Sequence, residues 1–83
     1  MIKSINIEKY QKLLAWLKEE RLSRCLSVRD LALKIDEPFQ FVSKIETGQR
    51  KLNVYEYVQY CEALDLDPVE GLAILTKKGF INR

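Results

Sequence analysis

The chain has 83 residues, which is enough for one small domain with a modest core. Its net charge of +2 is too small to indicate a nucleic-acid binder by itself. No run approaches the roughly 18 apolar residues that a membrane span needs, and Met1-Ile2-Lys3 lacks the apolar core of a secretory signal. We therefore expect a cytoplasmic protein without a membrane contact.

Cysteine and histidine usage argues against several functions. Cys25 and Cys61 lie far apart in the sequence and form no CxxC pair, and the chain has no histidine. A structural zinc site usually needs four such ligands, so we expect no metal. Both thiols should stay reduced and serve as small buried hydrophobic groups. Without histidine, a glycine-rich phosphate loop or evident paired carboxylates, we expect no catalytic residue, no cofactor and no enzyme.

The first helix is predicted over residues 6–22. Asn6 can cap its start. An apolar stripe follows at helical spacing and is expected to face the core: Ile7, Tyr10, Leu14 and Leu17. Trp16 broadens this stripe, and packing is favoured over a ligand contact because tryptophan supplies a large apolar area.

Two short helical patterns follow, over residues 28–35 and 38–47. In each, apolar residues recur at offsets of three and four and share one face: Val28, Leu31, Ala32 and Ile35, then Phe41, Val42 and Ile45. Ser27 and Asp30 can form a capping box before the first. Pro38 suits the first turn of the second, and Gly48 suits the left-handed position that closes it. Two helices joined in this way predict a helix-turn-helix, whose second helix lies in the DNA major groove.

The second motif helix should present a polar face outward. Gln40, Ser43 and Lys44 lie on that face, with Phe39 at its edge. Glutamine can pair with adenine and lysine with guanine, while a phenylalanine ring can press on a thymine methyl group. We predict these four residues as base contacts, with the core as the alternative for Phe39. An ordinary solvated face would show the same pattern.

Basic residues gather around the motif. Residues 21–51 include seven basic and four acidic side chains, whereas residues 52–83 include three and five. A positive motif and a negative tail suit a domain with one side that faces DNA. Ser27 begins a helix whose free N–H groups can hold a phosphate, and Arg29 on its first turn adds a charge.

Two further helices are predicted after the motif. Asn53 and Glu56 can form a second capping box, and Asp67 with Pro68 suits the start of the last helix. Because glycine and proline are few and the apolar spacing is helical throughout, the sequence predicts an all-α fold.

The C-terminal segment carries more apolar surface than one core needs. Such a patch usually marks an interface, and cyclic dimers are the commonest assemblies. We therefore predict a two-fold homodimer contact through Ile74, Phe80 and Ile81.

Several fragments together point to a known family: Leu31-Ala32, Val42-Ser43-Lys44-Ile45-Glu46, Gly48, Leu64, Leu66 and Asp67-Pro68. Their joint spacing, from about Leu17 to Leu72, resembles the helix-turn-helix of the lambda-repressor-like family, also called the XRE family. The resemblance implies a compact five-helix bundle that binds double-stranded DNA, with residues 1–83 as a single domain.

The resemblance also implies roles for particular residues. Arg21, late in the first helix, and Glu46, at the end of the second motif helix, should form a partly buried ion pair. The loop after that helix commonly grips the phosphate backbone in this family, and Arg50 and Lys51 suit that role.

This sequence departs from the family pattern at three positions. Val28 and Phe39 stand where many phage repressors carry glutamine, and Cys25 stands where the family usually has glycine. The expected fold is unaffected, but no known code for reading bases can be carried across.

Two functional hypotheses follow. The first is a sequence-specific double-stranded-DNA-binding transcriptional regulator, a repressor that acts as a homodimer. The second is a protein-interaction module, such as an antitoxin or a repressor-like subunit of a larger complex, for which Phe39 and Phe41 beside Gln40 are suitable. Salt-dependent retention on DNA distinguishes the two.

Overall fold

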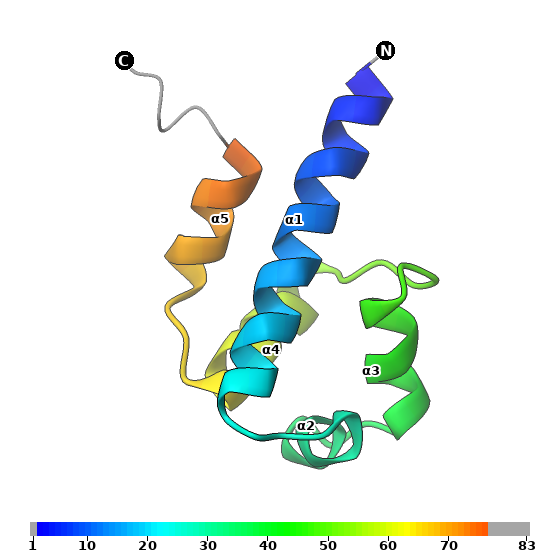
Figure 1. Ribbon diagram of the computed structural model, residues 1–83, viewed down its shortest axis with the longest axis vertical. Helices are drawn as coiled ribbons and strands as arrows, with labels where there is room; N and C mark the ends of the chain where they lie inside the picture. The colour runs from blue at the N-terminus through cyan, green and yellow to red at the C-terminus, as the bar shows by residue number, and fades with distance from the viewer. Residues whose placement is uncertain (1, 77–83) are drawn as a thin grey trace.

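The computed structural model describes residues 2–76, with side chains from Glu8 onward. Its secondary structure there is α-helical: α1 (Ile2–Ser23), α2 (Val28–Lys34), α3 (Phe39–Glu46), α4 (Val54–Leu64) and α5 (Pro68–Thr76). Helix α5 packs along α1, while α2, α3 and α4 lie toward the C-terminal half of α1 (Figure 1). The predicted five-helix, all-α bundle is confirmed.

The core is built from the apolar faces that the sequence spacing predicted. Its buried residues come from α1 to α4 and the residue that follows α2: Leu13, Leu14, Leu17, Leu31, Ala32, Ile35, Phe41, Val42, Ile45, Tyr57, Tyr60, Cys61 and Leu64. Trp16 is half-buried and packs against them, as predicted. Each large side chain that is fully buried contributes about 1.5–3 kcal/mol of transfer free energy.

The first four helices end in a common way. After each, a residue with positive φ turns the chain: Cys25, Asp36, Gly48 and Asp65. The next N–H then donates to the carbonyl five residues earlier, as from Gln49 to Lys44 at 2.8 Å and from Leu66 to Cys61 at 2.8 Å. This backbone pattern satisfies carbonyls that a helix end would otherwise leave unpaired. Gly48 is the one glycine of the four, and the sequence identified its role correctly.

Both predicted capping boxes are present. The Asp30 N–H donates to Ser27 Oγ at 3.0 Å, and the Ser27 N–H donates to Asp30 Oδ2 at 2.9 Å. In the second box, the Glu56 N–H donates to Asn53 Oδ1 at 2.8 Å and the Asn53 N–H donates to Glu56 Oε1 at 3.1 Å. These bonds fix the starts of α2 and α4.

Helix boundaries differ from the predictions at several places, each by a few residues. Asn6 lies inside α1 rather than capping it. The helix tolerates this position because an interior asparagine costs only about 0.7 kcal/mol. Pro38 is the residue before α3 and has an extended ψ of 155°, so it caps the helix instead of opening its first turn. The motif helices span 28–34 and 39–46, each slightly shorter than predicted, because Ile35 and Thr47 are C-cap residues.

The two cysteines have different environments. Both thiols are free, and Cys61 is fully buried as predicted. Cys25 is exposed, so its prediction as a packing residue was wrong. Its left-handed conformation in the turn after α1 places its side chain outside the core.

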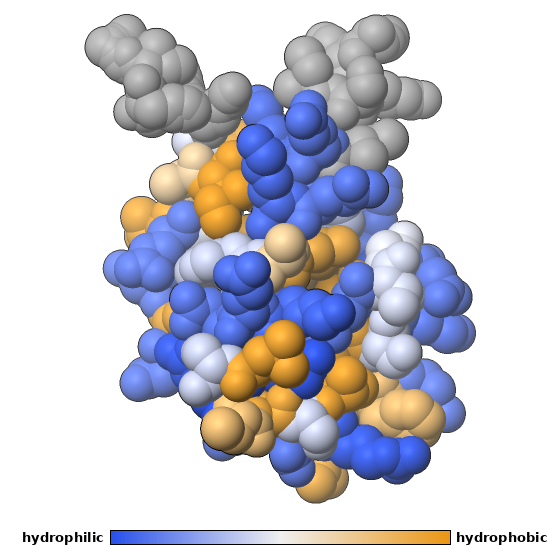
Figure 2. Space-filling view, viewed as in Figure 1, coloured by the Kyte–Doolittle hydropathy of each residue, from blue (hydrophilic) through white to orange (hydrophobic). Residues whose placement is uncertain are grey.

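Apolar side chains also remain on the surface. Figure 2 shows them in separate patches among hydrophilic residues on one face of the molecule. The large exposed ones are Leu22, Leu33, Phe39, Val54, Tyr55, Val69 and Leu72. Within the part of the chain that the structure describes, no helix is both long and apolar enough to cross a membrane.

Candidate nucleic-acid interface

Helix α3 has one buried and one open face. Phe41, Val42 and Ile45 point into the core, and α2 packs beside α3 (Figure 1). Gln40 and Lys44 are exposed, while Ser43 is half-buried. The structure thus places the polar side chains predicted as base contacts on the face that is open to solvent.

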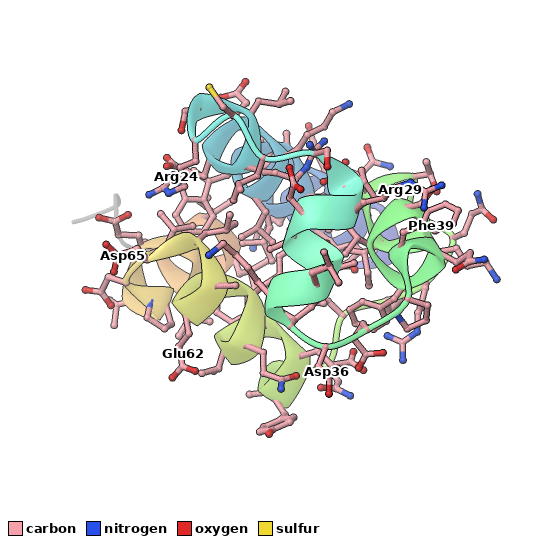
Figure 3. The ribbon with its side chains drawn as sticks, turned by 90° about the horizontal axis from the view of Figure 1, so that it is seen from below. Arg24, Arg29, Asp36, Phe39, Glu62 and Asp65 are labelled. Carbon is pink, nitrogen blue, oxygen red and sulfur yellow. The ribbon has the colours of Figure 1, made fainter. Side chains whose placement is uncertain are left out.

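Phe39 lies at the junction of α2 and α3 and is 36% exposed, so the alternative prediction of a core position was wrong. The Arg29 guanidinium carbon lies 4.2 Å from the centre of its ring. Figure 3 shows the two side chains next to each other, on the opposite side of the molecule from Glu62 and Asp65. A cation above an exposed aromatic ring contributes about 0.5–1 kcal/mol. Arg29 and Phe39 therefore stack on each other beside the start of α3.

The start of α2 combines the predicted capping box with free N–H groups. The Ser27 N–H and hydroxyl are both engaged with Asp30, so the N–H of Ser27 itself is not available to a phosphate. The hydrogen bond from the Ser27 N–H is the main cause of a lowered pKa for the Asp30 carboxyl. The N–H groups of Val28 and Arg29 remain without a partner among the described residues.

Arg21 and Glu46 form a bidentate ion pair that ties the end of α3 to α1. Arg21 Nε donates to Glu46 Oε2 at 2.6 Å, and Arg21 Nη2 donates to Glu46 Oε1 at 3.0 Å. Arg21 Nη1 also donates to the Leu26 carbonyl at 2.6 Å. Arg21 is only 5% exposed, so the pair lies largely out of water. This contact is the one that the family resemblance implies, and it fixes α3 relative to α1.

The loop between α3 and α4 is held at both ends. The left-handed Gly48 closes α3, and the Asn53 capping box begins α4. Between these points, the Leu52 N–H donates to Tyr10 Oη on α1 at 3.0 Å. Arg50 and Lys51, which are predicted phosphate contacts, are therefore carried on an anchored loop.

Arg50 is exposed but forms an intramolecular ion pair, which the sequence did not predict. Its Nη1 donates to Glu56 Oε1 at 2.8 Å, and its Nη2 donates to Glu56 Oε2 at 3.0 Å. The guanidinium carbon also lies 4.6 Å from the centre of the Phe41 ring. The hydrogen bond from Arg50 lowers the pKa of Glu56, and the same bond raises the pKa of Arg50. The sequence predicts Glu56 only as a capping residue, because no helical periodicity links it to a loop arginine six positions earlier.

The predicted dimer contact is described only in part. Ile74 is half-buried against the protein's own core. Phe80 and Ile81 lie outside the described residues. Over residues 2–76, no group of three or more histidine, cysteine or acidic residues is arranged to hold a metal ion.

Comparison with known proteins identifies the class of protein that this fold and surface define. A family model described as helix-turn-helix matches residues 17–70. An XRE-family like protein from Pseudomonas syringae pv. tomato str. DC3000 is 35% identical in sequence. The match covers 90% of this chain and 92% of that chain, with a TM-score of 0.84. No curated protein matches the chain.

The chain is therefore a helix-turn-helix protein with the fold of a DNA-binding regulator. It belongs to the XRE family.

Proposed function

We propose that this protein is a sequence-specific double-stranded-DNA-binding transcriptional regulator that acts as a cytoplasmic repressor. The observation that carries the proposal is the open face of α3, where Gln40 and Lys44 are exposed on a helix clamped by Arg21 and Glu46. Such a helix fits the major groove, where glutamine and lysine can distinguish base pairs. Ser43 and Phe39 complete the proposed base-contacting set.

Basic groups at both ends of α3 support this docking. Arg29 lies against Phe39 at the start of the helix, while Arg50 and Lys51 follow its end. In the proposed complex these side chains hold phosphates on either side of the groove, together with the helix start at Ser27. Phosphate contacts set the register of the protein on DNA without reading its sequence.

The proposed repressor is a homodimer of single-domain subunits that pair through the C-terminal segment, with Ile74, Phe80 and Ile81 in the contact. Paired recognition helices would enter successive major grooves, about 34–36 Å apart, and read a palindromic site. Occupying such a site blocks other proteins from the same DNA. A strictly monomeric mass in sedimentation at high protein concentration would contradict the pairing.

The proposal predicts that two kinds of side chain behave differently on DNA. Preferred sites would be selected from a random pool, and binding would be measured at several salt concentrations on a selected and a mixed-sequence duplex. Gln40→Ala should cost about 1–3 kcal/mol on the selected duplex and little on the mixed one. Lys51→Ala should weaken both equally and lower the salt slope by about one contact per subunit.

Gln59→Ala on α4 is the matched control and should leave both affinities unchanged. If wild-type protein shows no salt-sensitive binding to duplex DNA at low ionic strength but captures a protein partner, the interaction-module hypothesis replaces this one.

A further inference from the structure

Arg50 differs from the other basic residues of the interface because its guanidinium group is held on several sides. Glu56 accepts from both of its Nη atoms, at 2.8 and 3.0 Å. The Lys51 carbonyl accepts a further hydrogen bond from Nη1 at 3.2 Å. The Phe41 ring covers one face, with its centre 4.6 Å from the guanidinium carbon. We call Arg50 and these three partners the Arg50 cluster.

The cluster leaves one edge of the guanidinium group free. A guanidinium group has five N–H donors in a planar arrangement. Hydrogen bonds among the described residues use three of them, two to Glu56 and one to Lys51. The Nε hydrogen and the second Nη2 hydrogen remain, and they point in the same direction along one edge. Two parallel donors of this kind match two oxygens of a phosphate group.

Glu56 is fixed independently of Arg50. Its carboxylate accepts from the Asn53 N–H in the capping box of α4, and its side chain is only 13% exposed. The loop that carries Arg50 is itself anchored through Tyr10. The long arginine side chain is thus ordered by the fold before any ligand arrives, which removes an entropic cost from binding.

We propose that Glu56 and Phe41 are positioning residues, which hold Arg50 so that its Nε–Nη2 edge binds one DNA phosphate in bidentate fashion. The inference rests on the proposed DNA-binding function. It has a distinctive consequence, because an acidic residue near a phosphate should weaken binding by charge alone. Here Glu56 strengthens the binding through Arg50.

The decisive variant is Glu56→Gln, tested on a mixed-sequence duplex because phosphate contacts do not depend on sequence. Glutamine keeps an oxygen that can accept from the Asn53 N–H, but it loses the charge that holds Arg50. Binding should weaken by about two- to tenfold if positioning is lost. A purely electrostatic role for Glu56 predicts tighter binding instead. Glu37→Gln is the matched control, since Glu37 acts on Arg50 electrostatically without a hydrogen bond, and it should not weaken binding.

Two further variants separate positioning from stability. In an Arg50→Ala background, Glu56→Gln should cause no additional weakening, because Glu56 acts through Arg50. Arg50→Lys keeps the charge but loses the paired donors, so affinity should fall while the salt slope stays nearly constant. Thermal unfolding of each variant would verify that it is folded. In the wild type, the nitrogen-15 NMR signal of Arg50 Nε–H should shift when DNA is added.

The result that overturns the inference is tighter binding by Glu56→Gln, or equal weakening with and without Arg50. Wild-type affinity in Arg50→Lys, or an unshifted Nε–H signal in the DNA complex, would overturn it as well. All of these outcomes require that the wild type binds DNA. A wild type with no salt-sensitive binding refutes the proposed function itself, and the inference with it.

Discussion

Among residues 2–76, three residues other than glycine adopt a backbone conformation that usually belongs to glycine. Cys25 and Asp36 have φ angles of 57°, and Asp65 has 59°. Aspartate tolerates this region better than most residues because its short polar side chain forms local hydrogen bonds. Cysteine has no such compensation, and the left-handed conformation costs about 1–2 kcal/mol. The family's glycine at the position of Cys25 therefore has a physical reason.

We expect Cys25→Gly to stabilise the protein by about 0.5–1 kcal/mol. The substitution relieves the left-handed strain, and the greater freedom of glycine in the unfolded chain offsets part of the gain. Urea unfolding measures the change, and Cys25→Ser should give no comparable gain because serine keeps the strained Cβ. A lower unfolding free energy for Cys25→Gly would show that the exposed thiol contributes to packing after all.

At the residue level, the sequence predicted which side chains are buried better than which side chains form ion pairs. Apolar spacing identified Phe41, Val42 and Ile45 as inward because a helical period reports which side chains share a face. The partnership of Arg50 with Glu56 depends on the path of an irregular loop, and no spacing rule encodes such a path. The exposure of Cys25 escaped prediction for the same reason.

At the scale of the helices, two contacts fix how the elements pack: a buried ion pair between α1 and α3, and a close approach of α5 to α1 and α4. Arg21 and Glu46 join α1 to α3 where neither partner has good access to water. Glu46→Ala would leave the Arg21 charge buried, so unfolding free energy should fall by about 3–5 kcal/mol. Glu20→Ala removes the half-exposed ion pair with Arg24, whose Nη1–Oε1 distance is 2.7 Å, and should cost under about 1 kcal/mol. If Glu46→Ala and Glu20→Ala lower the free energy of urea unfolding equally, the Arg21–Glu46 pair contributes no more stability than the Glu20–Arg24 pair.

Gly71 allows α5 to approach α1 and α4 closely. A Cβ atom there would overlap Tyr57 Oη and would lie 2.8 Å from Trp16 Cζ3. Alanine is the better helix former by about 1 kcal/mol, yet Gly71→Ala should destabilise the protein by about 1–3 kcal/mol because α5 must move. Gly71→Ala should cost less in a Tyr57→Phe background, which lacks both the nearest atom and the hydrogen bond from Tyr57 to the Pro68 carbonyl. Stabilisation by Gly71→Ala in thermal unfolding would contradict the close contact.

The existence of all five helices could be predicted from apolar spacing and capping residues, with errors of a few residues at their ends. The sequence alone puts Pro38 inside α3, because proline is common both at the first helical position and just before a helix. The role of Gly71 could not be predicted, since it depends on residues of α1 and α4 that are distant in sequence. Local chemistry specifies elements, whereas close contacts between elements are a tertiary property.

For the whole molecule, stability should decline at both extremes of pH. Hydrogen bonds from Arg50 lower the folded pKa of Glu56 below its ordinary 4.5, and those from Ser27 lower the pKa of Asp30 below 3.8. The unfolded chain therefore binds more protons in acid, so stability present above about pH 4.5 is lost as the pH falls through the folded values. Burial raises the pKa of Tyr57 and of Tyr60, so stability is also lost as the pH rises above about 10.

Urea unfolding across this pH range measures the loss of stability in acid and in base. Tyr60→Phe should reduce the loss in base, and Glu56→Gln should reduce the loss in acid. If neither variant changes the pH dependence, other titrating groups control the stability.

The open face of α3 has a consequence for how such a protein evolves. The side chains of Gln40 and Lys44 form no hydrogen bond or ion pair with another residue of the described chain. Most mutations reduce the folding stability of a protein, and selection removes those that fall below the stability needed for function. Substitutions at Gln40 and Lys44 should leave the folding stability nearly unchanged. Under the proposed function, duplicated copies of the gene can therefore acquire new target sites by drift, without passing through an unstable ancestor.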